Sequence, residues 1–382
     1  MLGLIVFLTA CQPVQSNPKK QKTQPEEIRG VWVSYSEVNA LLADGGLEQN
    51  YTNLLENCAA LGLTDLFLHI RAFCDAIYPS EYFPLTAAAA AYEYDVLDYM
   101  ITKAHEKNIR VHGWLNPYRV RTADADFAAL PEKSPARIWK TDENPQNDTA
   151  VCVYNGIYLN PASSEVRQLI LNGIREVLTA YELDGIHLDD YFYPTTDPQF
   201  DAASYAAYVA SSAKPLSLAE WRIANVNALV SGCYTAVKFV DSDRIFSISP
   251  AADIEGNKTE LYADVAAWCE SGCVDWLIPQ LYFGFEYPTE AFRYETLLAR
   301  WKSVAEPTSA KLLIGLAPYK LATESEPDKA EWANTTDLLA RQVTAARKSG
   351  AAGVLFFSST ALFSGKEQNT AERESLKKIF SN

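Results

Sequence analysis

The sequence predicts a closed (β/α)8 barrel, the TIM barrel, as one large domain. Eight strand-like segments occur along the chain, and each precedes a helical pattern directly or after a loop. Many of them are almost entirely apolar, as expected for strands covered on both faces. Eight such alternations over about 350 residues favour a TIM barrel, with a doubly wound sheet as runner-up. The strand-like segments are 29–35, 65–72, 109–117, 185–192, 245–251, 274–283, 311–319 and 352–359.

The helical patterns repeat apolar residues at the spacing of one buried helix face. In the second pattern these are Val96, Leu97, Met100, Ile101 and Ala104. The patterns cover 48–61, 94–107, 165–181, 218–239, 261–271, 289–303, 336–349 and 371–380. Two long loops, 118–164 and 193–217, follow the third and fourth strands. Long loops at one end of a barrel are where a substrate cleft is built.

Composition and charge narrow the class of protein. The chain has 382 residues, of which 48% are hydrophobic, enough to bury a full core. Its net charge of −15 argues against a nucleic-acid partner, because the phosphate backbone repels an acidic surface. With 21 Tyr and 8 Trp the chain is rich in aromatic residues, which serve core packing and also suit sugar rings.

The N-terminus predicts export and lipid anchoring. An apolar run from Leu2 to Leu8, too short to span a bilayer, leads into Leu8-Thr-Ala-Cys11, which resembles the bacterial lipoprotein cleavage box. The resemblance implies removal of residues 1–10, a lipid on Cys11 and a place in the cell envelope, on a membrane and outside the cytoplasm. Residues 11–27 then form a flexible tether, and residues 28–382 form the barrel domain.

Six further cysteines show no compact disulfide framework. Cys269 and Cys273 lie four residues apart at the end of a predicted helix and can face the same side. A metal site built from these two alone is disfavoured, because no second Cys or His pair lies nearby in the sequence.

One stretch stands out as a place for chemistry: Asp184-Gly-Ile-His-Leu-Asp-Asp-Tyr-Phe-Tyr-Pro194. Its alternation predicts a strand with Ile186 and Leu188 on one face and His187 and Asp189 on the other. A carboxylate at the end of a barrel strand faces a ligand at the barrel mouth. The alternative is that the paired aspartates only cap a loop or a helix start.

Polar residues predicted to point into the barrel indicate a ligand site, because barrel interiors are normally filled with branched apolar side chains. The predicted sets are Phe67, His69 and Arg71; His112, Trp114 and Asn116; His187 and Asp189; and Trp276, Ile278, Gln280 and Tyr282. A hydrogen-bonded polar layer under a ligand site would explain the inward histidines. The alternative is that His69 and His112 point outwards into the helix layer.

Several motifs together resemble the bacterial glycosyl-hydrolase-like family ten. They are Gly30-Val-Trp-Val, His69-Ile-Arg-Ala-Phe-Cys-Asp-Ala-Ile-Tyr-Pro-Ser80, His112-Gly-Trp-Leu-Asn-Pro-Tyr-Arg119, Leu159-Asn-Pro161, the 184–194 stretch, Ser249-Pro250, Pro279-Gln-Leu-Tyr282 and Ile314-Gly315. The resemblance runs in order from about residue 28 to residue 360 and implies a TIM-barrel glycosidase, often a lipoprotein. Characterised relatives cut peptide-free (denuded) strands of cell-wall glycan. Two departures, His69 in place of Gln and Ala-Ala-Asp253 after Ser249-Pro250, bear on substrate preference more than on reaction class.

Glycoside hydrolysis normally needs two carboxyl groups that flank the bond. Asp189 is expected to be the nucleophile or base, and Asp190 to steer a loop or bind the sugar, with these roles exchangeable. The general acid is open: Asp75 can arch over the mouth, and Asp253 and Glu286 follow later strands. An acid needs an apolar setting that raises its pKa.

Other residues of these motifs are expected to bind substrate, with plain structural use as the alternative for each. Those expected to bind hydroxyl or acidic groups are Arg71, Asn116, Arg119, Gln280 and Tyr282, and those expected to form stacking walls are Trp114, Tyr191 and Tyr193. His112 and His187 complete the predicted substrate-binding set. No cofactor and no metal are implied.

Two other function classes remain open. One is a metal-dependent deacetylase or amidase with His69, His112, His187 and Asp189 as ligands, although these lie on separate strands without a short ligand motif. Loss of activity with a chelator would support it. The other is a glycan-binding lipoprotein that has kept the barrel and lost the acid, which would bind glycan strands without turnover.

Overall fold

The computed structural model describes residues 27–323 and 327–381. Its eight main strands form a closed barrel in the order β1-β11-β10-β9-β8-β7-β3-β2, and every neighbouring pair is parallel. The strands are β1 (Ile28–Val33), β2 (Asp65–Arg71), β3 (Arg110–Leu115), β7 (Gly185–Leu188), β8 (Ile245–Ile248), β9 (Trp276–Leu277), β10 (Lys311–Leu316) and β11 (Gly353–Phe356). The predicted TIM barrel is confirmed, and the doubly wound sheet is excluded.

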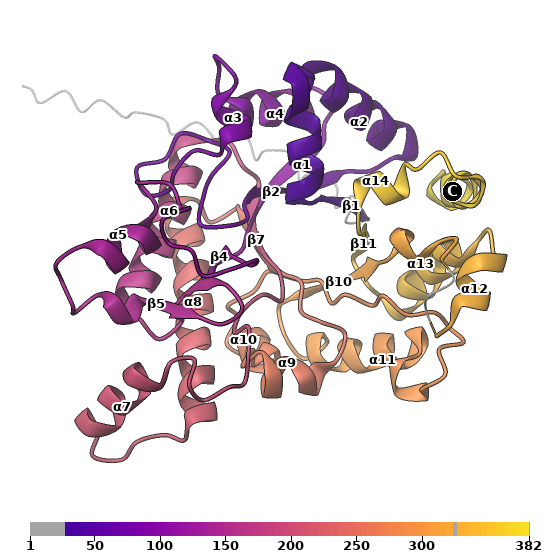
Figure 1. Ribbon diagram of the computed structural model, residues 1–382. Helices are drawn as coiled ribbons and strands as arrows, with labels where there is room; N and C mark the ends of the chain where they lie inside the picture. Colours follow the sequence, from indigo (N-terminus) through magenta and orange to yellow (C-terminus); the bar gives the residue numbers. More distant parts are fainter. Residues whose placement is uncertain (1–26, 324–326, 382) are drawn as a thin grey trace, which may run out of the picture.

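The helices surround the strands, as Figure 1 shows. Most of the predicted helical patterns match helices to within a few residues. The α-helices are α1 (Tyr35–Leu42), α2 (Leu47–Leu61), α3 (Ala87–Ala90), α4 (Val96–His105), α5 (Pro135–Thr141), α6 (Ser164–Ala180), α7 (Ala202–Ser211), α8 (Leu218–Val240), α9 (Ile254–Glu260), α10 (Val265–Glu270), α11 (Tyr294–Ala305), α12 (Lys329–Asn334), α13 (Leu338–Ser349), α14 (Ser359–Leu362) and α15 (Glu367–Phe380). By length and composition α8 could cross a membrane, but it packs against α6 in the layer around the barrel.

Every predicted strand is shorter in the structure than in the sequence pattern, and the shortening of two of them shapes the site. β9 ends at Leu277 because Pro279 has no N–H to continue the ladder, although Gln280 still bridges Ala251 and Gly315. β7 ends at Leu188, so Asp189 and Asp190 leave the ladder just past the strand. In both cases the segment after the strand leaves the sheet at the same end of the barrel, the end where the parallel strands finish.

The two long loops carry structure of their own. Loop 118–164 folds into a three-stranded antiparallel sheet of β4 (Arg119–Arg121), β6 (Ile157–Leu159) and β5 (Val151–Val153), with α5 beside it. Loop 193–217 contains α7, which projects from the body in Figure 1. Arg222 of α8 holds this loop by a buried ion pair with Asp201, 2.5 Å from Nη2 to Oδ1.

The apolar core has two parts, divided by the barrel wall. The larger part fills the space between strands and helices. The smaller part lies inside the barrel and consists of Ile28, Trp32, Phe67, Trp114, Trp276, Ile278, Leu313 and Leu355. Aromatic rings therefore fill much of the interior, where branched aliphatic residues are more usual. Three buried histidines, His69, His112 and His187, lie among them.

Candidate active site

The barrel interior contains polar groups at successive depths. At the start of β2, buried Asp65 contacts His112, 2.8 Å from Oδ1 to Nε2, and accepts a hydrogen bond from Arg110. Higher up, Trp32 donates from Nε1 to Nε2 of His187 at 3.0 Å. Burial lowers the pKa of His187 well below its ordinary value, so its ring is neutral and can accept this hydrogen bond. The predicted polar layer beneath the site is present, and both histidines point inwards.

A pocket of about 220 Å³ opens above this layer, where the strands end. Its lining residues are Trp32, Ser34, Tyr35, His69, Trp114, Arg119, Asp189, Asp190, Tyr191, Ser249, Gln280, Tyr282 and Phe357. They come from β1, β2, β3 and β4 or from the segments that follow β1, β7, β8, β9 and β11, so the barrel brings together residues far apart in sequence. Most of the walls are aromatic rings, and the acidic groups are the consecutive pair predicted from the 184–194 stretch.

Asp189 is fixed by three N–H donors. Its Oδ2 accepts from Trp114 Nε1 at 3.0 Å and from Asn116 Nδ2 at 2.5 Å, and its Oδ1 accepts from the backbone N–H of Tyr191 at 3.1 Å. Burial, followed by the charge of Asp190, raises the pKa of Asp189 to about 7 against the effect of these donors. The side chain is 4% exposed, so its charge is held in a largely water-free setting.

Asp190 is less enclosed and has a different partner. Gln280 donates from Nε2 to the backbone oxygen of Ser249 at 2.9 Å, and its side chain also hydrogen-bonds Asp190. Burial raises the pKa of Asp190 above its ordinary range. Since adjacent carboxyls in low dielectric repel each other as anions, the pair keeps one proton up to about pH 7.

Arg119 connects the acidic pair to the aromatic wall. Its Nη2 donates to Oδ1 of Asn116, the residue whose amide holds Asp189, and its Nε donates to the backbone oxygen of Ala72 at 3.1 Å. The guanidinium lies over three rings, at 5.6 Å from Tyr35, 4.5 Å from Phe73 and 4.9 Å from Tyr191. Asn116 thus hydrogen-bonds both Arg119 and Asp189, and it orients the Asp189 carboxylate from behind the pocket.

Most of the predicted site residues meet at this pocket. Trp114, Arg119, Asp189, Asp190, Tyr191, Gln280 and Tyr282 line it, Asn116 supports it and His187 lies beneath it. Six lining residues were not among the predicted catalytic or substrate-binding residues, namely Trp32, Ser34, Tyr35, His69, Ser249 and Phe357. The signal for them was present, because each lies on or just after a predicted strand.

The expectation that Arg71 binds substrate is corrected by the structure. A β-bulge between His69 and Arg71 shifts the register against β3, so Arg71 does not continue the inward face of Phe67 and His69. Its guanidinium lies 4.3 Å above the ring of Phe83 and against Gly173 of α6, in the helix layer. Arg71 is therefore a buried packing residue and does not line the pocket.

Three further predicted residues lie elsewhere. His112 lies two residues before Trp114 on β3, and its ring is hydrogen-bonded to Asp65 deep in the barrel. Tyr193 is buried behind the site against Phe200, Tyr262 and Arg222, so it is no stacking wall. Asp75 accepts a hydrogen bond from the N–H of Phe73 and lines neighbouring cavities instead of the pocket with Asp189. The expected arch of Asp75 over the mouth is not present.

The hypothesis of a metal site finds no support in the side-chain geometry. His112 is paired with Asp65, His187 with Trp32 and two serines, and His69 is stacked on Trp114 at 3.8 Å between ring centroids. Within residues 27–323 and 327–381 no group of three or more His, Cys, Asp or Glu side chains is placed to hold an ion. The six described cysteines are all free thiols.

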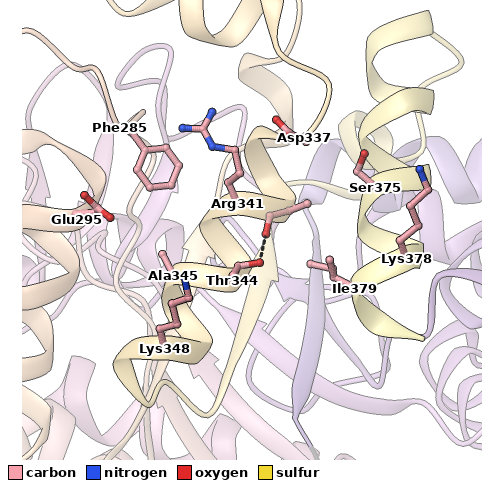
Figure 2. Close-up of a pocket in the computed structure, with 11 residues that line it drawn as sticks. Phe285, Glu295, Asp337, Arg341, Thr344, Ala345, Lys348, Ser375, Lys378 and Ile379 are labelled. Carbon is pink, nitrogen blue, oxygen red and sulfur yellow. Dashed lines mark hydrogen bonds between the residues drawn. The ribbon is translucent and has the colours of Figure 1, made fainter. Parts of the chain in front are cut away.

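A larger cavity of about 660 Å³ lies on the outside of the barrel, between α11, α13 and α15 (Figure 2). Arg341 lies over the Phe285 ring at 4.7 Å there, and Lys348 and Lys378 extend from different helices. Its charged groups come from helix surfaces and do not converge as those at the strand ends do. The acidic pair therefore defines the better candidate active site.

Comparison with known proteins agrees with this geometry. The family model described as "Glycosyl hydrolase-like 10" matches residues 27–334. The chain is 30% identical to glycosyl hydrolase YngK of Bacillus subtilis (strain 168) over 350 residues, covering 84% of this chain but 66% of that protein. It is 28% identical to glycosyl hydrolase DigH of Escherichia coli (strain K12) over 382 residues, covering 86% of this chain and 84% of DigH.

Solved structures share the fold at low sequence identity. The PgaB (BpsB) glycoside hydrolase domain from Bordetella bronchiseptica superposes with a TM-score of 0.62 at 14% identity, covering 92% of this chain and 99% of that one. A glycoside hydrolase family 18 N-acetylglucosaminidase from Paenibacillus barengoltzii gives a TM-score of 0.51 at 12% identity, with 92% and 99% coverage. On the match over most of its barrel, this chain belongs to the glycosyl hydrolase-like 10 family.

Proposed function

We propose that this protein is a glycoside hydrolase that cleaves peptide-free glycan strands of the bacterial cell wall. One observation carries the proposal: two consecutive carboxyl groups, buried Asp189 and half-buried Asp190, line an aromatic-walled pocket at the carboxyl end of a closed barrel. Glycosidic bond cleavage needs a proton donor for the leaving oxygen and a negative charge near the cationic transition state. A carboxyl pair that shares one proton near neutral pH supplies both.

The walls of the pocket suit a sugar chain. Tyr282 and Phe357 stack at 6.0 Å between ring centroids, and the rings of Tyr35 and Tyr191 lie against the Arg119 guanidinium. Aromatic faces bind the apolar faces of sugar rings, and the polar edges of Gln280 and Ser249 suit hydroxyl and amide groups. Tyr191 is 56% exposed, so it can contact a sugar that extends beyond the pocket.

The cell-wall substrate rests on the family and on charge. The resemblance of the motifs to family ten implies peptide-free cell-wall glycan as the substrate, and removal of the peptides leaves a carboxylate on alternate sugars. Arg119 gives an otherwise acidic pocket a cation that can attract such a group. The two named relatives, YngK and DigH, are glycosyl hydrolases.

A lipid anchor would place this activity at the cell envelope. Cys11 and the preceding signal lie outside the described residues, so the support for the anchor is the sequence Leu8-Thr-Ala-Cys11 alone. The barrel domain, residues 28–382, would be the part that acts on the glycan.

The test is to incubate the purified protein with peptide-free cell-wall glycan and to analyse the products by mass spectrometry. Short oligosaccharides whose masses match added water are expected. Strands that bind to the protein but remain uncut would indicate the glycan-binding lipoprotein instead. A chelator such as EDTA should leave the rate unchanged, and a loss of rate would revive the metal-dependent hypothesis.

A further inference from the structure

The pocket has carboxyl groups on one wall only. Among the described residues that line it, Asp189 and Asp190 are the acidic ones, and they are consecutive in the chain at the end of one strand. The other lining residues include the aromatic side chains of Trp32, Tyr282 and Phe357 and carry no carboxyl group. The two-carboxylate mechanism places its groups on opposite sides of the bond, about 5–9.5 Å apart, so that one protonates and the other attacks or activates water.

Two nearby carboxyl groups, those of Asp75 and Glu37, do not supply the second carboxylate of that mechanism. Asp75 lies behind Phe73 and lines the adjoining cavities. Glu37 follows pocket residue Ser34, but its carboxylate accepts hydrogen bonds from Ser34, Ser358, Ser359 and Thr360, which occupy both oxygens. Neither group is available to attack a sugar bound beside Asp189.

Asp189 itself is poorly placed as a nucleophile. Its two oxygens accept three N–H donors, and Trp114 and Asn116 both bind the same one, Oδ2. These donors stabilise the anion and fix its orientation, so Asp189 acts as a fixed charge and its oxygens are not free to bond to a sugar. Asp190 has the Gln280 side chain as its partner and is the more accessible of the two. The two carboxyls share one proton, and the form that can react is the one in which Asp190 holds it, at the more accessible position, while Asp189 is the anion held by its three donors.

We propose that the nucleophile is supplied by the substrate: the carbonyl oxygen of a 2-acetamido group attacks the anomeric carbon, and the enzyme cleaves chains of 2-acetamido sugars with retention of configuration. The inference rests on the proposed glycosidase function and defines its substrate class and chemistry. Substrate-assisted hydrolysis of this kind is known among glycosidases as an exception to the two-carboxylate rule.

Asp190 gives its proton to the glycosidic oxygen, the bond from that oxygen to C1 breaks, and the acetamido oxygen bonds to C1 to form an oxazolinium ion. The N–H of that ion faces the Asp189 carboxylate, which stabilises its positive charge. Water then attacks C1 and returns a proton to Asp190, while the bond from C1 to the acetamido oxygen breaks. The products are two sugar chains, with one water consumed.

The remaining pocket residues suit an acetamido group. Tyr282 lines the pocket, and burial raises the pKa of its hydroxyl well above the ordinary value, so it stays protonated and can donate a hydrogen bond. The indole rings of Trp32 and Trp114 offer apolar surface for a methyl group. One acceptor, one donor and an apolar wall are what a planar N-acetyl group requires.

The experiment compares three preparations of peptide-free glycan strands: native, chemically de-N-acetylated, and de-N-acetylated strands that have been re-acetylated. De-N-acetylation should lower kcat/KM by at least about 100-fold, because an intramolecular nucleophile is lost. Re-acetylation should restore the rate, which controls for damage to the strands. NMR of the first product should show the same anomer as the substrate. A thiazoline analogue of N-acetylglucosamine, which mimics the oxazolinium ion, should inhibit at least about 100-fold more tightly than N-acetylglucosamine.

The outcomes separate this inference from the proposed function. Cleavage with inversion, equal cleavage of de-N-acetylated strands, or a covalent sugar on Asp189 or Asp190 trapped with a 2-fluoro glycoside would overturn the inference and leave the glycosidase function standing. No cleavage of any preparation and no binding of the thiazoline would overturn both. Retention together with loss and recovery of rate across the three preparations would establish participation of the acetamido group.

Discussion

The indole Nε1 of Trp114 donates a hydrogen bond to Oδ2 of Asp189 at 3.0 Å, across the junction of two neighbouring strands. Trp114 lies on β3, and Asp189 follows β7, which pairs with β3 in the barrel. The strand pairing therefore sets the separation of the two side chains. The hydrogen bond stabilises the charged form of Asp189 at a place where burial disfavours it.

The first prediction concerns this hydrogen bond. Trp114→Phe removes the donor, so the pKa of Asp189 should rise further above its ordinary value. If the ionised carboxylate is the form that works, the acidic limb of the kcat/KM profile should move to higher pH. The measurement is a pH–rate profile on peptide-free glycan strands.

A matched control is Trp268→Phe, which removes an indole donor to Asn227 in the helix layer and should leave the profile in place. Asn116→Ala removes a second donor from the same oxygen and should shift the limb in the same direction as Trp114→Phe. An unchanged limb in both site variants would mean that the ionisation of Asp189 does not govern activity.

The second prediction concerns Asp189 itself. Asp189→Asn keeps the size of the side chain but removes its charge, so the cationic transition state loses its fixed partner. Turnover should fall by about 10²–10⁴-fold while glycan binding persists. Turnover and binding are measured on the same strands, and the circular dichroism spectrum should match that of the parent. Near-normal turnover would show that the Asp189 carboxylate does not stabilise the transition state.

The sequence pattern was sufficient for the architecture and for most of the pocket, because both follow from strand periodicity. A strand that alternates and then ends in Asp189 places that residue at the mouth of any parallel barrel, and the same logic located Trp114 and Gln280. Strand bounds near Pro279 were overextended, since the apolar pattern continues where the ladder cannot.

The errors arose where side-chain direction depends on contacts that periodicity does not encode. A bulge of one residue in β2 turned Arg71 out of the barrel. His112 does share the inward face, but the Asp65 carboxylate holds it far below the mouth. Tyr193 turns away because the chain bends after Asp190 and buries the ring on Arg222. No single-sequence signal specifies these partners.

The third prediction concerns stability outside the site. The guanidinium of Arg222 hydrogen-bonds both oxygens of Asp201, and both side chains are fully buried. Asp201→Ala leaves that cation without its charge partner, so unfolding free energy should drop by about 3–5 kcal/mol. Urea denaturation measures the loss.

The double variant Asp201→Ala with Arg222→Met is the control for this pair. It removes the buried charge altogether and should recover part of the lost stability. If the double variant is no more stable than Asp201→Ala, the cost lies in lost packing of the 193–217 loop and not in an uncompensated charge.

The fourth prediction concerns anchoring. Cys11→Ala removes the thiol that the proposed lipid would modify, so the protein should move from the membrane fraction to the soluble fraction of cells. Immunoblots of the two fractions give the measurement. Cys273→Ala is the matched control, because that thiol is partly exposed on the barrel and should leave the distribution unchanged. A Cys11→Ala protein that still sediments with membranes would remove the support for a lipid anchor.

The last prediction separates the candidate acids. If Asp190 donates the proton to the leaving oxygen, Asp190→Asn should slow hydrolysis of glycan strands by about 10²–10⁴-fold. It should slow aryl glycosides with acidic phenol leaving groups far less, because these leave without protonation. Asp75→Asn should be close to the parent on both substrates, since Asp75 faces a different cavity. Plots of rate against leaving-group pKa give the comparison. A steep plot for Asp75→Asn and a flat one for Asp190→Asn would transfer the role of acid to Asp75, and the two-carboxylate mechanism would then regain the second group that the pocket otherwise lacks.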